Sequence, residues 1–195
     1  MTDGDDIAET LLEGDPYEQA VLNVRRVFPL SLRRKIQTAI LTLAASVLFG
    51  PALAVRRDAI EAFERTTTLQ LAISTMAFFG VIVTFAFGVL LVRQQRILQK
   101  RSLTEQDARR LVRIEDMIMF FAVQGMAFIL IPTVLSVVGV VSPGTIGTLY
   151  AYGVAVYTPA GAVSVDARLV SALGVVLSGG LFALWWIVRR GDPAP

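Results

Sequence analysis

Two adjacent carboxylates, Glu115 and Asp116, are the residues of this sequence whose position most suggests chemistry. They stand directly before an apolar stretch that begins at Met117, and Arg109 and Arg113 precede them. On a helix, residues three and four apart are neighbours, so an interfacial salt bridge with Arg113 or Arg109 is the simpler interpretation. The alternative is a cation site or a proton relay, because ionisable groups at membrane spans serve such roles.

Gln124 is the one amide well inside the same apolar stretch. In hydrocarbon an amide gains from a hydrogen bond to another helix, and this is the expected role of Gln124. Binding of a solute is the alternative. Glu115, Asp116 and Gln124 together form the candidate polar site of the chain.

The composition excludes most other chemistry. The 195 residues include no Cys and no His, which removes ordinary zinc sites, Fe–S clusters, the usual haem ligands and Ser-His-Asp or Cys-His catalysis. A calcium loop beginning at Asp3 fails, because Ile7 and Ala8 stand where a carboxylate and a glycine are required. We therefore predict no catalytic residue, no metal ligand and no cofactor.

The elements that must position these residues are membrane-spanning helices. The chain is 54% hydrophobic and 17% charged, whereas soluble domains carry about 25% charged residues. Four stretches, 36–55, 69–92, 117–141 and 169–188, contain no Asp, Glu, Lys or Arg and have spanning length. The sequence predicts an all-α integral membrane protein, with a four-helix membrane domain over residues 31–195.

The basic residues predict the orientation. If the N-terminus is inside, only Arg56, Arg57, Arg65 and Arg168 of the eighteen basic residues fall outside. Both termini are therefore expected in the cytoplasm, with the chain in the inner or plasma membrane. The basic residues around the connection between the second and third stretches are expected to contact the anionic headgroups of the inner leaflet, and no nucleic acid is expected: Arg93, Arg96, Lys100, Arg101, Arg109, Arg110 and Arg113.

Residues 1–30 are expected to form an acidic tail followed by an amphipathic helix. Asp15-Pro16 is a helix start, and Pro29 is a helix end. Between them Tyr17, Val21, Val24 and Phe28 recur at helical spacing and form one apolar stripe. A helix lying on the inner membrane face is expected, and a helix that docks on a partner protein is the alternative.

Residues 142–168 are expected to form a small outer β-hairpin. Tyr150, Tyr152, Val154 and Val156 alternate with smaller residues, which is a period of two. A turn signal follows at Thr158-Pro159-Ala160-Gly161, and residues 162–165 supply the return strand. A potassium filter at residues 148–153 is disfavoured, because no apolar pore helix precedes it.

Small and polar residues recur at helical spacing within the spans. Such residues let helices approach closely in lipid, so helix–helix contact is expected for Thr38, Thr42, Ser46, Gly80, Thr84, Gly88, Gly174 and Ser178. A hydrated pathway is the alternative, and Phe49 in the same sector of the first span argues against it. The prediction is a non-catalytic protein that acts by helix–helix association, as a homo-oligomer or as a subunit of a membrane complex. A channel or small-solute transporter formed by an oligomer is the first alternative, and a membrane-bound enzyme acting on lipid is the second.

Overall fold

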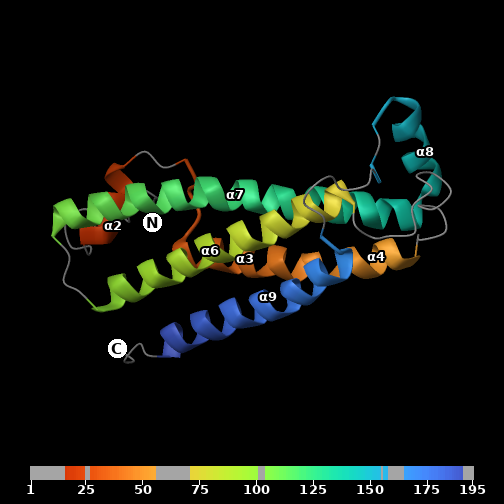
Figure 1. Ribbon diagram of the computed structural model, residues 1–195. Helices are drawn as coiled ribbons and strands as arrows, with labels where there is room; N and C mark the ends of the chain where they lie inside the picture. The colour runs from red at the N-terminus through yellow and green to blue at the C-terminus, as the bar shows by residue number, and fades with distance from the viewer. Residues whose placement is uncertain are drawn as a thin grey trace, which may run out of the picture.

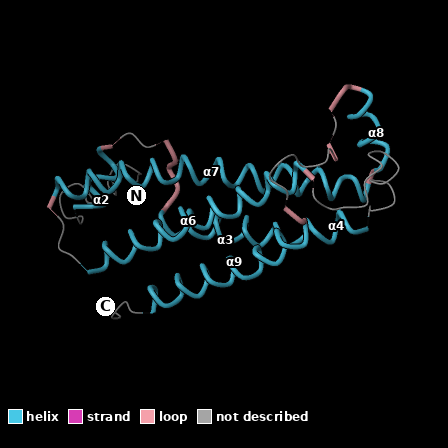
Figure 2. Tube along the Cα trace, in the orientation of Figure 1, coloured by secondary structure: helices cyan, strands magenta, loops and turns pink. Residues whose placement is uncertain are grey.

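Helices make up nearly all of the described part of the chain, and four of them are long (Figures 1 and 2). The computed structural model describes residues 16–24, 27–55, 71–100, 104–154, 156–157 and 165–190. No strand occurs among these residues, which confirms the predicted all-helical class. In chain order the elements are α2 (Pro16–Asn23), α3 (Leu32–Ala45), the 3-10 turn η1 (Ser46–Leu48), α4 (Phe49–Val55), α6 (Ala72–Lys100), α7 (Glu105–Val141), α8 (Pro143–Ala151) and α9 (Ala167–Arg190).

The four predicted apolar stretches correspond to four helical segments that are long and apolar enough to cross a membrane. These are Leu32–Val55, Ala72–Gln99, Glu105–Val141 and Ala167–Arg190. α6 and α7 continue beyond their apolar stretches into basic segments. At ~1.5 Å per residue α7 is about 55 Å long, well beyond the ~30 Å of a hydrocarbon core.

The long helices form one bundle in which α7 and α9 lie on opposite sides of α3 and α6 (Figure 1). The starts of α3 and α7 and the ends of α6 and α9 point to the same end of the bundle (Figure 1). We call this the arginine-rich end, because it carries Arg33, Arg34, Arg93, Arg96, Arg109, Arg110, Arg113, Arg189 and Arg190. A single apolar core runs between the helices and includes residues of all four.

Glycine allows the closest crossing, between α6 and α7. A Cβ placed on Gly80 would lie 2.7 Å from the Gly125 carbonyl oxygen and 2.9 Å from the Ile129 nitrogen. A Cβ on Gly125 would lie 2.7 Å from the Thr84 hydroxyl in return. The two backbones are therefore in contact at this point. In lipid, such close contact stabilises a helix pair, and larger residues would prevent it.

Small residues also seat α9 against its neighbours. A Cβ on Gly88 of α6 would lie 2.6 Å from Leu181 Cδ2. A Cβ on Gly174 would meet the Ser46 hydroxyl and lie 3.2 Å from the Leu43 carbonyl oxygen. Gly179 and Gly180, one turn further along α9, have no atom within 4 Å of such a Cβ. The small residues of α9 are thus divided between an inner contact and an open outer face.

The expected outer hairpin is wrong. Residues Pro143–Ala151 form helix α8, with Ser142 at the N-cap position and Pro143 in its first turn. Proline suits that position because its missing N–H has no partner in a first turn. The chain then turns at Gly153, whose φ of +80° favours glycine. Residues 162–164 of the expected return strand lie outside the described residues.

The N-terminal helix α2 is shorter than expected and packs on α7. It ends at Asn23, and its Tyr17 and Val21, together with Val24 just after it, contact a small cluster formed by Ala20, Ala108 and Val112. Phe28, the fourth member of the stripe, packs separately against the main core. Most of the stripe is thus covered by the same chain, and the location of α2 at a membrane surface stays a prediction. The acidic tail, residues 1–15, lies outside the described residues.

Candidate functional site

A buried ion cluster joins the first and third spans at the arginine-rich end. The Lys35 ammonium donates to Glu115 Oε1 at 2.7 Å and lies 3.5 Å from Asp116 Oδ1. The side chains of Lys35 and Glu115 are 0% and 1% exposed, and that of Asp116 is 15% exposed. Burying a charged group costs free energy unless the group is paired and hydrogen-bonded. Here the Lys35 ammonium and the Glu115 carboxylate are buried together, and each supplies the opposite charge that the other needs.

Two further groups bring the N-terminal segment to the same carboxylates. The Tyr17 hydroxyl on α2 donates to Glu115 Oε2, and the Val27 backbone N–H donates to Asp116 Oδ2 at 2.9 Å. Hydrogen bonds to an ionised acceptor are stronger than neutral ones. The cluster therefore holds α2, the segment after it and the first turn of α3 onto one point of α7.

The local sequence explains why Lys35 reaches this place. Ser31 is the N-cap of α3, and its hydroxyl accepts from the Arg34 backbone N–H at 3.4 Å. The helix that begins there puts Lys35 on the same face as Ala39, Thr42 and Ser46, all of which are buried. Because of helical spacing, Lys35 lies on the small-residue face of the first span, which packs inside the bundle.

The expected partners of Glu115 and Asp116 are wrong. In the structure both carboxylates pair with Lys35, eighty positions away in sequence, and not with Arg113 or Arg109. Arg109 pairs with Glu105 one turn earlier, and Arg113 is exposed. Sequence reasoning missed Lys35, although its place on the small-residue face of the first span was a usable signal.

The candidate polar site does not assemble as one site. Glu115 and Asp116 lie in the cluster, but Gln124 lies nine residues further along α7, about 13 Å by helical rise, on the outer surface of the bundle. Gln124 is exposed, and its amide makes no hydrogen bond to another helix in the described part of the chain. The expected hydrogen bond of Gln124 to another helix is therefore not made among the described residues.

Ser46, one of the small polar residues of the first span, lies against α9 where the helix is interrupted. Thr42 and Ser46 are buried, while the Thr38 hydroxyl donates to the Arg34 carbonyl. α3 ends at Ala45, and η1 separates it from α4. Pro51 lies just beyond this break and contributes no backbone N–H. Ser178, further along α9, donates to the Val175 carbonyl of its own helix.

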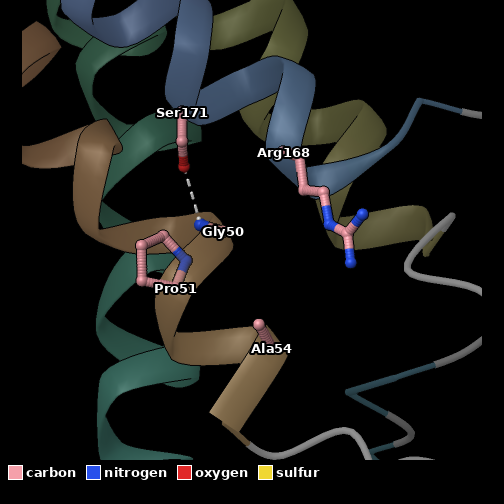
Figure 3. Close-up of a pocket in the computed structure, with 5 residues that line it drawn as sticks. All are labelled: Gly50, Pro51, Ala54, Arg168 and Ser171. Carbon is pink, nitrogen blue, oxygen red and sulfur yellow. Dashed lines mark hydrogen bonds between the residues drawn. The ribbon is translucent and has the colours of Figure 1, made fainter.

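Ser171 of α9 repairs the break (Figure 3). The Gly50 N–H donates to the Ser171 hydroxyl at 2.8 Å, and that hydroxyl lies 3.3 Å from the Ser46 carbonyl oxygen, to which it donates. Gly50 N–H and Ser46 C=O are the two groups that an unbroken helix would join to each other. A neighbouring hydroxyl inserted into the helical ladder is a recognised cause of helix breaks and satisfies the freed groups in a membrane.

A pocket of about 330 Å³ opens beside this break and is lined by Gly50, Pro51, Ala54, Arg168 and Ser171 (Figure 3). Four of these five residues present small or apolar groups to it. Arg168 is the charged member of the lining; it is exposed, and its backbone N–H donates to Asp166 Oδ1 at 2.7 Å.

Replacing Ser171 by alanine is expected to lower the free energy of unfolding by about 1–2 kcal/mol, because the N–H of the buried Gly50 loses its acceptor. The free energy is measured by reversible unfolding of the purified protein in mixed micelles. The matched control is Ser178→Ala on the same helix, where the hydroxyl only bonds its own helix, and a change within about 0.5 kcal/mol is expected. Equal effects of the two substitutions would contradict the repair role of Ser171.

The residues expected to contact lipid headgroups lie at the arginine-rich end. Arg93, Arg96, Arg109, Arg110 and Arg113 are all exposed, at the end of α6 and the start of α7. Arg101 and the side chain of Lys100 lie outside the described residues. These charges surround the place where the ion cluster lies beneath the surface of the bundle.

The ion cluster is arranged to fasten helices together. The Lys35 ammonium takes the place between two carboxylates that a bound cation would otherwise occupy. Within the described ranges, no three His, Cys, Asp or Glu side chains gather to hold a metal ion. Comparisons of the chain with protein-family models, with curated proteins and with solved structures find no match.

Proposed function

We propose that this protein is a non-catalytic, multi-pass protein of the cell membrane that works by helix–helix association in the bilayer. It associates with itself or serves as an accessory subunit of a membrane complex, and both of its termini lie in the cytoplasm. The orientation rests on the distribution of basic residues, which the structure gathers at the arginine-rich end.

The exposed amide of Gln124 is the observation that carries this proposal. Gln124 lies on the outer surface of α7, about 10 Å past Met117 along the helix axis, where the apolar stretch begins. That distance exceeds the reach of its short side chain back to the membrane surface. A carboxamide facing hydrocarbon lacks hydrogen-bond partners, and a helix of another molecule supplies them.

The open face of α9 supports the same proposal. A smaller part of α9 is covered than of the other three spans, and its Gly179 and Gly180 meet no neighbour. Gly80, Gly88 and Gly174, in contrast, already pack against helices of the same chain. Association in the membrane would therefore use surfaces that the fold itself leaves open.

The two alternative functions receive less support. A solute pathway along Thr42 and Ser46 would pass through a face that α9 covers and that Phe49 fills. Lipid chemistry at Glu115 and Asp116 would have to displace Lys35 and Tyr17 from carboxylates that they already occupy.

Photo-cross-linking in native membranes tests the proposed association. p-Benzoylphenylalanine replaces Phe120, an exposed aromatic one turn from Gln124, and the control carries it at Phe79, an exposed aromatic of α6. We expect a discrete protein adduct from position 120 that Gln124→Leu reduces several-fold, and no such adduct from position 79. If position 120 yields only lipid adducts, or if its protein adduct is insensitive to Gln124→Leu, the proposal is wrong.

A further inference from the structure

The exposed side of α7 carries a regular seam around Gln124. Its members follow each other at alternating steps of three and four residues, and we call them the α7 seam: Met117, Phe120, Gln124, Ala127, Ile131 and Val134. Met117, Phe120, Ile131 and Val134 are 57%, 52%, 51% and 56% exposed, Gln124 is exposed and Ala127 is half-buried. At 100° per residue the seam is centred opposite the buried face of α7, which includes Ala122, Gly125 and Ile129.

This spacing is the heptad pattern of a helix pair. Residues at a and d positions of a heptad form the seam along which two helices wind around each other. Met117, Gln124 and Ile131 take the a positions, and Phe120, Ala127 and Val134 take the d positions. A single polar amide at an a position is a known device for fixing the register and the number of helices.

From this geometry we infer that the α7 seam is the contact between two copies of this chain, with Gln124 of each copy hydrogen-bonded to Gln124 of the other. The inference rests on the proposed function and names its partner. Two copies with the same orientation in one membrane are related by a two-fold axis along the membrane normal, so each residue meets its own counterpart at the same depth. A carboxamide offers both donors and an acceptor, and it therefore pairs with an identical group.

The surroundings of the seam leave room for the second copy. α2 contacts α7 at Ala108 and Val112, before the seam begins, and α8 approaches it at Gly139, after the seam ends. α9 lies on the far side of the bundle (Figure 1). No charged residue interrupts the seam, and the small side chain of Ala127 next to Gln124 allows the two helices to approach closely.

Disulfide cross-linking tests the inference cleanly, because the natural chain has no cysteine. Ile131→Cys places one thiol in the seam, one heptad beyond Gln124, and Ile187→Cys places one on α9, where Ile187 is also exposed. On oxidation of native membranes we expect a covalent dimer from Ile131→Cys and little from Ile187→Cys. Adding Gln124→Leu is expected to raise the dissociation constant of the dimer in liposomes, followed by energy transfer between labelled copies, by about 3- to 30-fold. Gln124→Asn, which keeps the amide, is expected to retain part of the affinity.

The outcomes separate this inference from the proposed function. All the substituted positions are exposed, so folding is expected to persist, and circular dichroism checks it. If Ile131→Cys gives no more dimer than Ile187→Cys while benzoylphenylalanine at position 120 traps a different protein, the self-association is wrong and the proposed function stands. If neither experiment gives a protein adduct, both are wrong. A dimer whose affinity is the same with Gln124→Leu would also overturn the role of the amide.

Discussion

Replacing Lys35 by methionine is expected to lower the free energy of unfolding by about 3–5 kcal/mol, the largest effect of any single substitution considered for this chain. The substitution keeps most of the side-chain volume but removes the ammonium that lies 2.7 Å from Glu115 Oε1, and the Glu115 side chain is only 1% exposed. Asp116 loses its nearest cation as well. The free energy of unfolding is measured in mixed micelles by the loss of helical circular dichroism, with the wild-type chain in parallel.

Two matched variants show whether the loss comes from removal of the ion pair between Lys35 and Glu115. In Lys35→Met/Glu115→Gln the buried charge of residue 115 is also removed, so the double variant is expected to be less destabilised than the sum of its two single changes by about 0.5–3 kcal/mol. Arg109→Met breaks an exposed pair with Glu105 and is expected to cost no more than about 0.5 kcal/mol. A Lys35→Met chain as stable as Arg109→Met would show that the cluster does not hold the helices together.

Replacing Gly80 by leucine is expected to cost about 3 kcal/mol or more, at the upper end of the range for overpacked interiors. Its Cβ alone would lie within 3 Å of three backbone atoms of α7, in Gly125, Phe128 and Ile129. Backbone atoms cannot rotate away as a side chain can, so α6 and α7 must separate along their longest contact. The separation is measured by unfolding in mixed micelles and by faster proteolysis of the variant in membranes.

Gly88 and Gly179 provide a graded comparison on the same chain. At Gly88 the nearest atom is the flexible end of Leu181, which can move, so Gly88→Leu is expected to cost less than Gly80→Leu. At Gly179 a new side chain meets open space, and leucine is a better helix former than glycine, so stability is expected to be unchanged or slightly higher. If Gly179→Leu destabilised the chain as strongly as Gly80→Leu, the crossing of α6 and α7 would not be the cause.

Local patterns predicted the spans, because hydropathy and length are properties of neighbouring residues. The uncharged stretches 36–55 and 117–141 are predicted to be helical on this basis alone, and the structure is helical over both. The predicted outer hairpin is wrong for a local reason as well: a helix begins after Ser142 with Pro143 in its first turn, and it extends through Tyr150, where the alternation begins.

Contacts between distant segments were the part that the sequence could not provide. The pairing of Lys35 with Glu115 depends on which faces of α3 and α7 meet, and nearby arginines were equally plausible partners by charge alone. The insertion of Ser171 between Gly50 and Ser46 depends in the same way on the approach of α9. The sequence marks Gln124 as an amide inside an apolar stretch, but its outward direction follows only from the helix rotation that packing imposes.

The separation of eighty positions between Lys35 and Glu115 imposes an order on biogenesis. Lys35 precedes Glu115 in synthesis, so in the proposed membrane location the first helix inserts with an ammonium that must stay with water or headgroups until its counter-ion is made. Only when the third helix has been threaded through the insertion machinery can that ammonium move into the interior. The contact between Lys35 and Glu115 therefore forms only after the third helix has been made, and Ser171 of α9, which bonds Gly50 and Ser46 of the first span, arrives later still.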